Sequence, residues 1–383
     1  MRRSFMQRLV CPTCQGELRC ESFAEEPVAP PPESANGPAD ASHVQEGLLI
    51  CESCQAWYPV HRYVPVMLDF STNFHQHFSR QHAAHADVFN KYHAPQGEPR
   101  EGERSIQETF TDEWNQVNVD EIHFDKSHEQ FVELIRAAWL KWIERDRVEV
   151  KQVLDVGCGL GREAMALATA TGAEVTAIDL NFAVLRSGPQ FRHIPNVHLV
   201  IASLFRPPFR TETFDLVFSQ GVIHHTYSSE AAFRSIARFV RPGGHCFIWV
   251  YAFEDSLTKP GLSGFLLRRT YDLESLLRPA ISRSPKPLRD VIFVGLTAAA
   301  YPFWKARARM TQRPQSWNSI THHMRDVFSP RYAYRHGYNE LIGWFESERF
   351  RIVDVQSDVA HRQIMNGTRA FGVGLTGRKL AHE

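Results

Sequence analysis

Four cysteines near the N-terminus are spaced as the ligands of one metal ion. Cys11-Pro-Thr-Cys14 and Cys51-Glu-Ser-Cys54 are two C-x-x-C pairs, and each pair can place two thiolates on a tetrahedral zinc ion. Disulfides do not suit a chain that we expect to be cytoplasmic, and a redox dithiol would explain one pair but not both. Because four thiolates fill a tetrahedral site, we expect a structural zinc ion with no open position for catalysis.

A glycine-rich loop is the second chemical feature. Residues 153–157 (VLDVG) are expected to form a buried strand, and C-G-L-G then leads into a helical stretch. Glycines in such a turn let the backbone approach a ligand, and the following helix presents its N-terminus. The dinucleotide fingerprint G-x-G-x-x-G does not fit, because Arg162 occupies the position of its third glycine. The pattern is D-x-G-x-G-x-G instead.

An acidic residue ends the next expected strand. Residues 174–179 (EVTAID) end at Asp179, 22 residues after Gly157. A carboxylate at the tip of this strand can accept both hydroxyls of a ribose. The alternative is an ordinary helix cap ahead of residues 181–186, and the neighbouring glycine loop makes this alternative weaker.

These motifs require a sheet that brings the ends of several strands together. Five apolar segments are candidate strands: 153–157, 174–179, 197–202, 214–219 and 245–251. Helix-compatible stretches lie mostly between them. Near-continuous apolar strands alternating with helices indicate a parallel sheet that is covered on both faces. We therefore predict a doubly wound α/β domain.

Together the motifs resemble the class I S-adenosylmethionine-dependent methyltransferases, in the type 11 group with ubiquinone- and menaquinone-type members. The resemblance rests on the glycine motif at 155–161, Asp179, F-D-L-V at 214–217 and R-P-G-G at 241–244. It covers residues 150–255 closely, and the combination of motifs is highly specific. It implies a mostly parallel seven-stranded sheet in which the last two strands, 350–355 and 370–378, form an edge hairpin.

The resemblance also implies which residues contact S-adenosylmethionine. They come from the glycine loop and from the ends of the next three strands: Asp155, Gly157, Gly159, Gly161, Asp179, Leu180, Ser203, Leu204, Ser219 and Gln220. Ser203 departs from the family, which commonly has Asp at this position. A hydrogen bond to an uncharged acceptor is weaker than a charge-assisted one. We therefore expect that cofactor affinity suffers or that a neighbour compensates.

The N-terminal residues resemble the Trm112-like zinc ribbons, small modules found fused to or bound by methyltransferases. The similarity covers residues 8–70, in the segments LVCPTCQGEL, LLICESCQAWYPV and YVPVMLDF. One departure is a Pro-, Ala- and Glu-rich insert at 21–42 that we expect to be disordered. Another is Tyr63, where the family usually has Gly. The expected domains are a zinc ribbon at 1–70, a helical linker or cap region at 71–150 with an amphipathic helix at 130–145, and a methyltransferase domain at 151–383.

Three side chains are candidates for a catalytic role. Methyl transfer is an in-line displacement, so the protein mainly aligns the nucleophile and excludes water, with a general base where the acceptor needs one. His224, His225 and Tyr227 follow the fourth strand, where open α/β sheets bind ligands. The alternative is that one histidine packs in the loop and the other caps a helix. The aromatic stretch at 110–114 either covers the cofactor or faces the core, and we favour the core.

An insertion at about 253–337 precedes the last expected helix. It holds Arg-rich and apolar helical pieces, which either pack on the sheet as a buried helix or form a substrate cap for an apolar or lipid-linked acceptor. The 383 residues include 43 Lys or Arg and 43 Asp or Glu, so the charge balance gives no sign of a nucleic-acid partner. No signal-peptide core and no spanning apolar run is present, and we expect a cytoplasmic location.

The function expected from these observations is methyl transfer from S-adenosylmethionine to a small-molecule or lipid- or glycan-linked acceptor. One alternative is an RNA- or translation-related methyltransferase, which the neutral charge disfavours. Another is a catalytically silent scaffold that binds a partner through its zinc ribbon. The intact glycine loop with Asp179 argues against this loss of activity.

Overall fold

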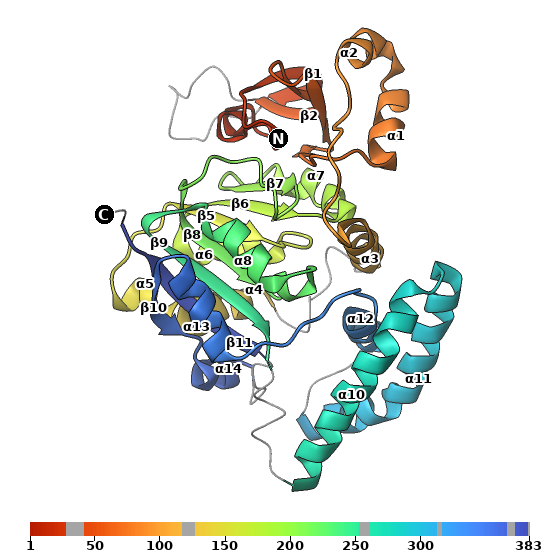
Figure 1. Ribbon diagram of the computed structural model, residues 1–383, viewed down its shortest axis with the longest axis vertical. Helices are drawn as coiled ribbons and strands as arrows, with labels where there is room; N and C mark the ends of the chain where they lie inside the picture. Colours follow the sequence, from red (N-terminus) through yellow and green to blue (C-terminus); the bar gives the residue numbers. More distant parts are fainter. Residues whose placement is uncertain (28–41, 117–126, 253–260, 312–315, 366–371, 382–383) are drawn as a thin grey trace.

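The computed structural model describes residues 1–27, 42–116, 127–252, 261–311, 316–365 and 372–381 (Figure 1). Within these residues the chain forms two sheets. An N-terminal sheet has the strand order β1-β2-β3-β4, and a seven-stranded sheet has the order β10-β11-β9-β8-β5-β6-β7. The module that contains the first sheet lies next to β7, where the Met67 N–H donates to the Ile201 carbonyl at 2.7 Å.

The N-terminal sheet is antiparallel throughout. Its strands are β1 (Leu18–Pro27), β2 (Ser42–Cys51), β3 (Ala56–His61) and β4 (Val64–Pro65). The prediction of disorder for 21–42 was wrong at both ends of that segment, because β1 continues to Pro27 and pairs there with Ser42. Cross-strand hydrogen bonds thus extend into the polar segment, and the rest of it, 28–41, lies outside the described residues.

Short helices connect the two sheets. They are η1 (Arg3–Arg8), before the first sheet, and α1 (Asn73–Gln81), η2 (Ala83–His85), α2 (Ala86–Lys91), α3 (Glu103–Asn115), α4 (His128–Glu133), η3 (Leu134–Trp139) and α5 (Lys141–Arg145). The single amphipathic helix predicted at 130–145 is interrupted. A π-helical turn at η3 closes with a hydrogen bond from the Leu140 N–H to the Ile135 carbonyl at 2.7 Å. The interruption leaves both Trp139 and Trp142 in the core, with 2% or less of each exposed.

The seven-stranded sheet has the predicted architecture. Its strands are β5 (Gln152–Val156), β6 (Glu174–Asp179), β7 (Val197–Ile201), β8 (Phe214–Gln220), β9 (Val240–Tyr251), β10 (Phe350–Val355) and β11 (Gly372–Lys379). The first five are parallel, and β10 and β11 form the antiparallel edge hairpin. One detail differs: the R-P-G-G segment at 241–244, which precedes the expected strand at 245–251, belongs to β9. A register shift between Phe214 and Leu216 accommodates it.

Helices cover both faces of this sheet, which confirms the doubly wound α/β fold. The remaining helices of the domain are α6 (Arg162–Thr171), η4 (Phe182–Arg186), α7 (Gly188–Phe191), η5 (Ile223–His225), α8 (Ser229–Ala237), α13 (Tyr338–Ser347) and α14 (Asp358–Ile364). Phe233 of α8 and Phe345 of α13 belong to one apolar cluster. Leu167 of α6 and Trp139 of η3 belong to a second cluster.

Three further helices form a separate group beyond β9. They are α10 (Gly261–Arg283), α11 (Lys286–Thr311) and α12 (Trp317–Phe328), shown in teal and blue in Figure 1. The group contacts the rest of the protein partly through α12, which packs against α3. Among the described residues, no helix combines the length and apolar character needed to cross a membrane.

Candidate active site

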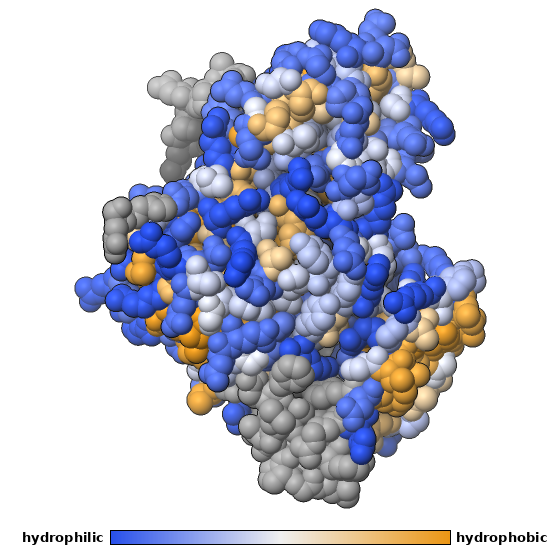
Figure 2. Space-filling model, in the orientation of Figure 1, coloured by the Kyte–Doolittle hydropathy of each residue, from blue (hydrophilic) through white to orange (hydrophobic). Residues whose placement is uncertain are grey.

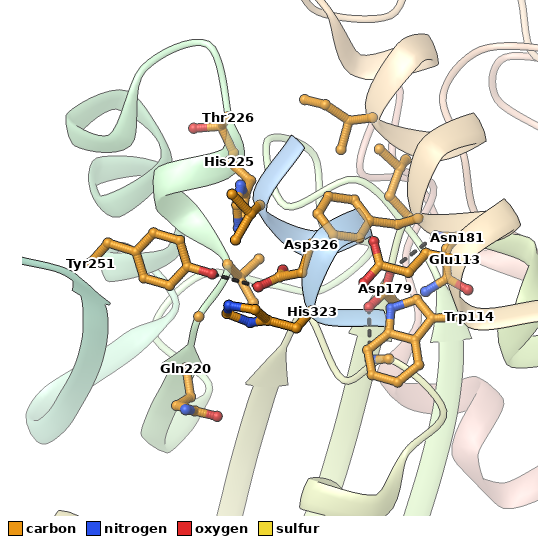
Figure 3. Close-up of a pocket in the computed structure, with 18 of the residues that line it drawn as sticks. Glu113, Trp114, Asp179, Asn181, Gln220, His225, Thr226, Tyr251, His323 and Asp326 are labelled. Atoms are coloured by element: carbon orange, nitrogen blue, oxygen red, sulfur yellow. Dashed lines mark hydrogen bonds between the residues drawn. The ribbon is translucent and has the colours of Figure 1, made fainter. Parts of the chain in front are cut away.

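A cavity of about 1250 Å³ lies where the carboxyl ends of β5, β6, β8 and β9 face α3 and the α10–α12 group. Figure 3 shows side chains from β6, β8, β9, α3 and α12 around it. Open α/β sheets bind ligands at this edge, because the loops after parallel strands meet there. The cavity is therefore the candidate active site.

The glycine loop forms one wall. Gly157, Gly159 and Gly161 have left-handed φ angles of +85°, +56° and +87°. A Cβ atom on Gly157 would lie 2.1 Å from a methyl carbon of Val222, and one on Gly159 would lie 2.6 Å from the Trp114 indole. Both the conformation and the space therefore require glycine at these two positions.

Asp179 connects the end of β6 to this loop. Its Oδ2 accepts a hydrogen bond from the Gly159 N–H at 2.8 Å, and its Oδ1 accepts one from the Asn181 N–H at 2.9 Å. The second bond is local, to the residue that precedes η4, whereas the first orders the glycine loop. Desolvation raises the pKa of this carboxyl, and the two N–H donors oppose part of the rise. Because a carboxylate has about four lone-pair sites, each oxygen can accept one further hydrogen bond.

The other residues that the resemblance implies for cofactor contact divide into two groups. Leu180, Leu204 and Gln220 line the cavity with Gly157, Gly159 and Asp179. Asp155, Gly161, Ser203 and Ser219 are not among the lining residues. Ser219 is fully buried and donates to the Val156 carbonyl at 3.2 Å. Asp155 is buried too, and its Oδ2 has no hydrogen-bond partner among the described residues.

Glu103 is an acidic residue that the sequence analysis missed. It begins α3 and is 4% exposed, yet it lines the cavity beside Leu204. Its Oε2 accepts a hydrogen bond from the Arg100 N–H at 2.7 Å. Burial raises the pKa of this carboxyl, and interaction with the Ser203 hydroxyl lowers it in part. A carboxylate thus lies next to the position where the family commonly has Asp and this chain has serine.

The three candidate catalytic residues occupy different environments. His224 is fully buried and does not line the cavity, and neither ring nitrogen has a hydrogen-bond partner in the described part of the chain. Burial holds the pKa of His224 well below its ordinary value, so the ring is neutral near pH 7. This residue packs in the loop, as one of the two alternatives expected. Tyr227 lines the cavity, with its ring 5.1 Å from that of Phe205.

His225 lines the cavity and has a defined tautomer. Its Nδ1 lies 2.8 Å from the Tyr332 carbonyl oxygen, and because a carbonyl only accepts, Nδ1 carries the proton. In the neutral ring Nε2 then has a free lone pair. Burial lowers the pKa of His225, while the charge of Asp326 raises it in part. The neutral ring can therefore accept a proton at neutral pH.

Three further polar residues that no motif indicated line the cavity. The Tyr251 hydroxyl donates to Asp326 Oδ2 at 2.8 Å, as the dashed line in Figure 3 shows. Desolvation holds the pKa of Tyr251 well above its ordinary value, so the phenol keeps its proton. Glu113 of α3 is 4% exposed, and its Oε2 lacks a hydrogen-bond partner among the described residues. Burial, followed by the charge of Asp326, raises the pKa of Glu113 well above its ordinary value.

Aromatic and apolar residues complete the wall. Phe110 and Trp114, which we expected to face the core, line the cavity instead because α3 lies across the glycine loop. The α11 helix contributes only apolar side chains: Leu296, Ala299, Ala300, Phe303, Trp304 and Ala308. The site thus joins a polar end near the strands to an apolar end beneath α11.

The four N-terminal cysteines come together outside this cavity. Their sulfur atoms all lie within 4.8 Å of one another, with Cys11 3.5 Å from Cys54 and Cys14 3.4 Å from Cys51. Zinc–sulfur bonds of about 2.3 Å in a tetrahedron separate sulfurs by roughly 3.8 Å, so the cluster fits one zinc ion. None of the four lines the cavity. The predicted ligand set is therefore brought together away from the candidate active site.

Comparisons with known proteins cover both parts of the chain. Residues 154–248 match the family model described as a methyltransferase domain, and residues 2–62 match that of the Trm112p-like proteins. Phosphoethanolamine N-methyltransferase 3 of Arabidopsis thaliana is 27% identical over 130 residues, which are 33% of this chain and 26% of that protein. The chain thus spans about a quarter of the length of this relative.

One further relative and one solved structure are also similar to this chain. A probable phthiotriol/phenolphthiotriol dimycocerosates methyltransferase of Mycobacterium ulcerans is 34% identical over 96 residues, 25% of this chain and 37% of that protein. A solved complex with the Haloferax volcanii Trm112 methyltransferase activator aligns with a TM-score of 0.42 and 12% identity, over 73% of this chain and 99% of that chain. The two family matches thus place a segment similar to methyltransferase domains at 154–248 and a segment similar to Trm112p-like proteins at 2–62.

Proposed function

We propose that the chain binds S-adenosylmethionine in this cavity and methylates an acceptor that has a long apolar part. The residues fit this cofactor in three respects. Gly157 and Gly159 of the glycine loop line the cavity, Asp179 has lone pairs for ribose hydroxyls, and Glu103 offers a carboxylate acceptor for the adenine amino group. Glu103 is thus the neighbour that compensates for the serine at position 203.

When bound, S-adenosylmethionine supplies the activated methyl group, and the residues of the chain position the acceptor. His225 Nε2 is the group that takes a proton from an acidic acceptor atom, since its other ring nitrogen is held by the Tyr332 carbonyl. Tyr251 and Asp326 orient the polar end of the acceptor through their shared hydrogen bond. Burial among α3, β9 and α12 excludes water from this end of the cavity.

The apolar wall of α11 is the observation that favours a lipid-like acceptor. Six α11 side chains line the cavity, and all are alanine, leucine or aromatic. A cavity with a polar end and an apolar end suits a molecule with a reactive head and a hydrocarbon tail. One relative, squalene methyltransferase 1 of Botryococcus braunii, is named for an apolar acceptor. The α10–α12 group would then act as the acceptor cap.

We also propose that one zinc ion bound by Cys11, Cys14, Cys51 and Cys54 stabilises the N-terminal module. The four sulfur atoms lie within 4.8 Å of one another, which is close enough for one tetrahedral zinc ion to bind them all. With all four positions filled by thiolates, the ion would have no place for water or substrate. Its role would be structural.

The acceptor class is tested with labelled cofactor. Purified protein is incubated with methyl-labelled S-adenosylmethionine and a cell extract divided into lipid, small-molecule, protein and RNA fractions. We expect label in the lipid fraction with wild type and none with Gly159→Val. Label that appears mainly in RNA or protein would overturn the acceptor assignment.

A further inference from the structure

An exposed apolar surface covers the outer side of the α10–α11 helix pair. Leu288, Val291 and Val294 lie on successive turns of α11 and are 53%, 68% and 57% exposed. On α10, Leu273 and Leu276 are 53% and 75% exposed. Figure 2 shows hydrophobic surface gathered over α11. Contiguous exposed apolar patches mark interaction sites, whereas scattered single residues do not.

The charge of these two helices differs from that of the whole chain. Their sequences carry nine Lys or Arg and three Asp or Glu, although the full chain is balanced. Basic residues lie at both ends of the apolar surface of α11, with Lys286 before Leu288 and with Lys305 and Arg309 after Phe303, and all three are exposed. Asp290, the acidic residue of α11, pairs with Arg325 at 3.0 Å, and Lys286 pairs with Asp112 of α3 at 2.5 Å. The surface therefore combines apolar side chains with positive charge.

The cavity reaches this surface. Leu273 and Phe303 both line the cavity, and they are 53% and 67% exposed to solvent. A side chain that faces both the cavity and the solvent marks the opening between them. An apolar molecule that enters between these residues meets the apolar wall of α11 before it reaches Tyr251 and Asp326.

We propose that this α10–α11 surface docks on the face of an anionic phospholipid bilayer. Helices with an apolar face and flanking basic residues lie in the plane of the interface, with apolar side chains at the acyl boundary and basic side chains near the headgroups. The described helices include none that could span the bilayer, so the contact is peripheral. Docking turns the opening at Leu273 and Phe303 toward the lipid. The proposal extends the proposed acceptor class, but its physical basis, the surface itself, does not depend on methyl transfer.

Vesicle flotation of the full-length protein tests the proposal. Vesicles of phosphatidylcholine alone are compared with vesicles that also contain phosphatidylglycerol. We expect wild type to float with the anionic vesicles, and we expect the floated fraction to fall at high salt because screening weakens the charge contribution. The double variant Val291→Asp/Val294→Asp should float at least tenfold less. Lys305→Glu/Arg309→Glu should lose binding to the anionic vesicles in particular.

A matched control and a folding check complete the test. Val359 of α14 is 66% exposed, close to the exposure of Val291, so Val359→Asp should float as wild type does. Binding of S-adenosylhomocysteine by each variant shows that the fold survives, and it separates failure of this proposal from failure of the proposed function. Equal flotation of the Val291→Asp/Val294→Asp variant and wild type would overturn the proposal. A wild type that does not float but forms a dimer, which the variant does not form, would overturn it too and would assign the surface to a second copy.

Discussion

Replacing Gly159 by alanine tests two reasons for glycine at this position: the left-handed backbone angle and the lack of space beside Trp114. At a φ of +56° an L-residue costs roughly 1–2 kcal/mol relative to glycine. In addition, the new Cβ would lie 2.6 Å from the Trp114 indole, whereas carbon atoms prefer separations of about 3.5–4.0 Å. The indole or the loop must therefore move by roughly 1 Å, and both line the proposed cofactor site.

Gly172 provides a matched control. It ends α6 at a φ of +71°, and a Cβ there would meet nothing within 4 Å. Gly172→Ala should thus have the same conformational cost without disturbing the cavity. Urea unfolding should show a loss of roughly 1–2 kcal/mol for Gly172→Ala and a larger loss for Gly159→Ala, which adds the clash with Trp114.

Calorimetry with S-adenosylhomocysteine then distinguishes them. We expect at least tenfold weaker binding for Gly159→Ala, about 1.4 kcal/mol, and wild-type affinity for Gly172→Ala. Wild-type affinity in a folded Gly159→Ala protein would refute the placement of the cofactor against this loop. Equal losses of affinity in the two variants would show that the effect is a general one on stability.

Four further predictions concern other parts of the molecule. Glu103→Gln replaces a charged acceptor by a neutral one, so affinity for S-adenosylhomocysteine should fall about fivefold. The preference of the protein for S-adenosylhomocysteine over an inosine analogue that lacks the amino group should also shrink. An unchanged preference would contradict this role of Glu103. With an acidic acceptor, the activity of wild type should fall as pH drops through the pKa of His225, which burial lowers, because protonated Nε2 cannot take a proton. The same loss of activity at low pH in His225→Ala would exclude His225 as the base. Cys51→Ser should lose zinc and make residues 1–70 sensitive to protease while cofactor binding persists, and a protein without zinc whose module resists cleavage would disprove the zinc site. Burial lowers the pKa of His75 to about 4, so between pH 7 and pH 5 the imidazole of His75 becomes protonated only in the unfolded chain. The free energy of unfolding should therefore fall by about 2 kcal/mol over this range because of His75. A His75→Asn protein should lose correspondingly less.

The sheet and the glycine loop could be predicted because their physical requirements are visible in short segments. Parallel strands buried on both faces are nearly continuous apolar runs, and all five predicted runs are strands. The glycine positions follow from left-handed backbone angles that other residues rarely adopt. The paired cysteines follow from the ligand chemistry of zinc, and their sulfur atoms do come together.

The acceptor side of the cavity could not be predicted because it depends on packing between distant segments. Glu103 and Glu113 come from α3, and Asp326 comes from α12 in the insertion. Nothing in the spacing of these residues indicates that α3 crosses the glycine loop or that α12 packs against α3. For the same reason the tautomer of His225 depends on Tyr332, 107 residues further along the chain. His224 shows the opposite error, since its position after β8 suggested chemistry, whereas the structure buries it.

Titration of the wild-type protein with S-adenosylhomocysteine tests whether this cavity binds the methyl-donor cofactor. We expect saturable binding of one molecule per chain, and we expect S-adenosylmethionine to compete for the same site. A folded wild-type protein that shows neither binding heat nor thermal stabilisation at millimolar S-adenosylhomocysteine would contradict this expectation.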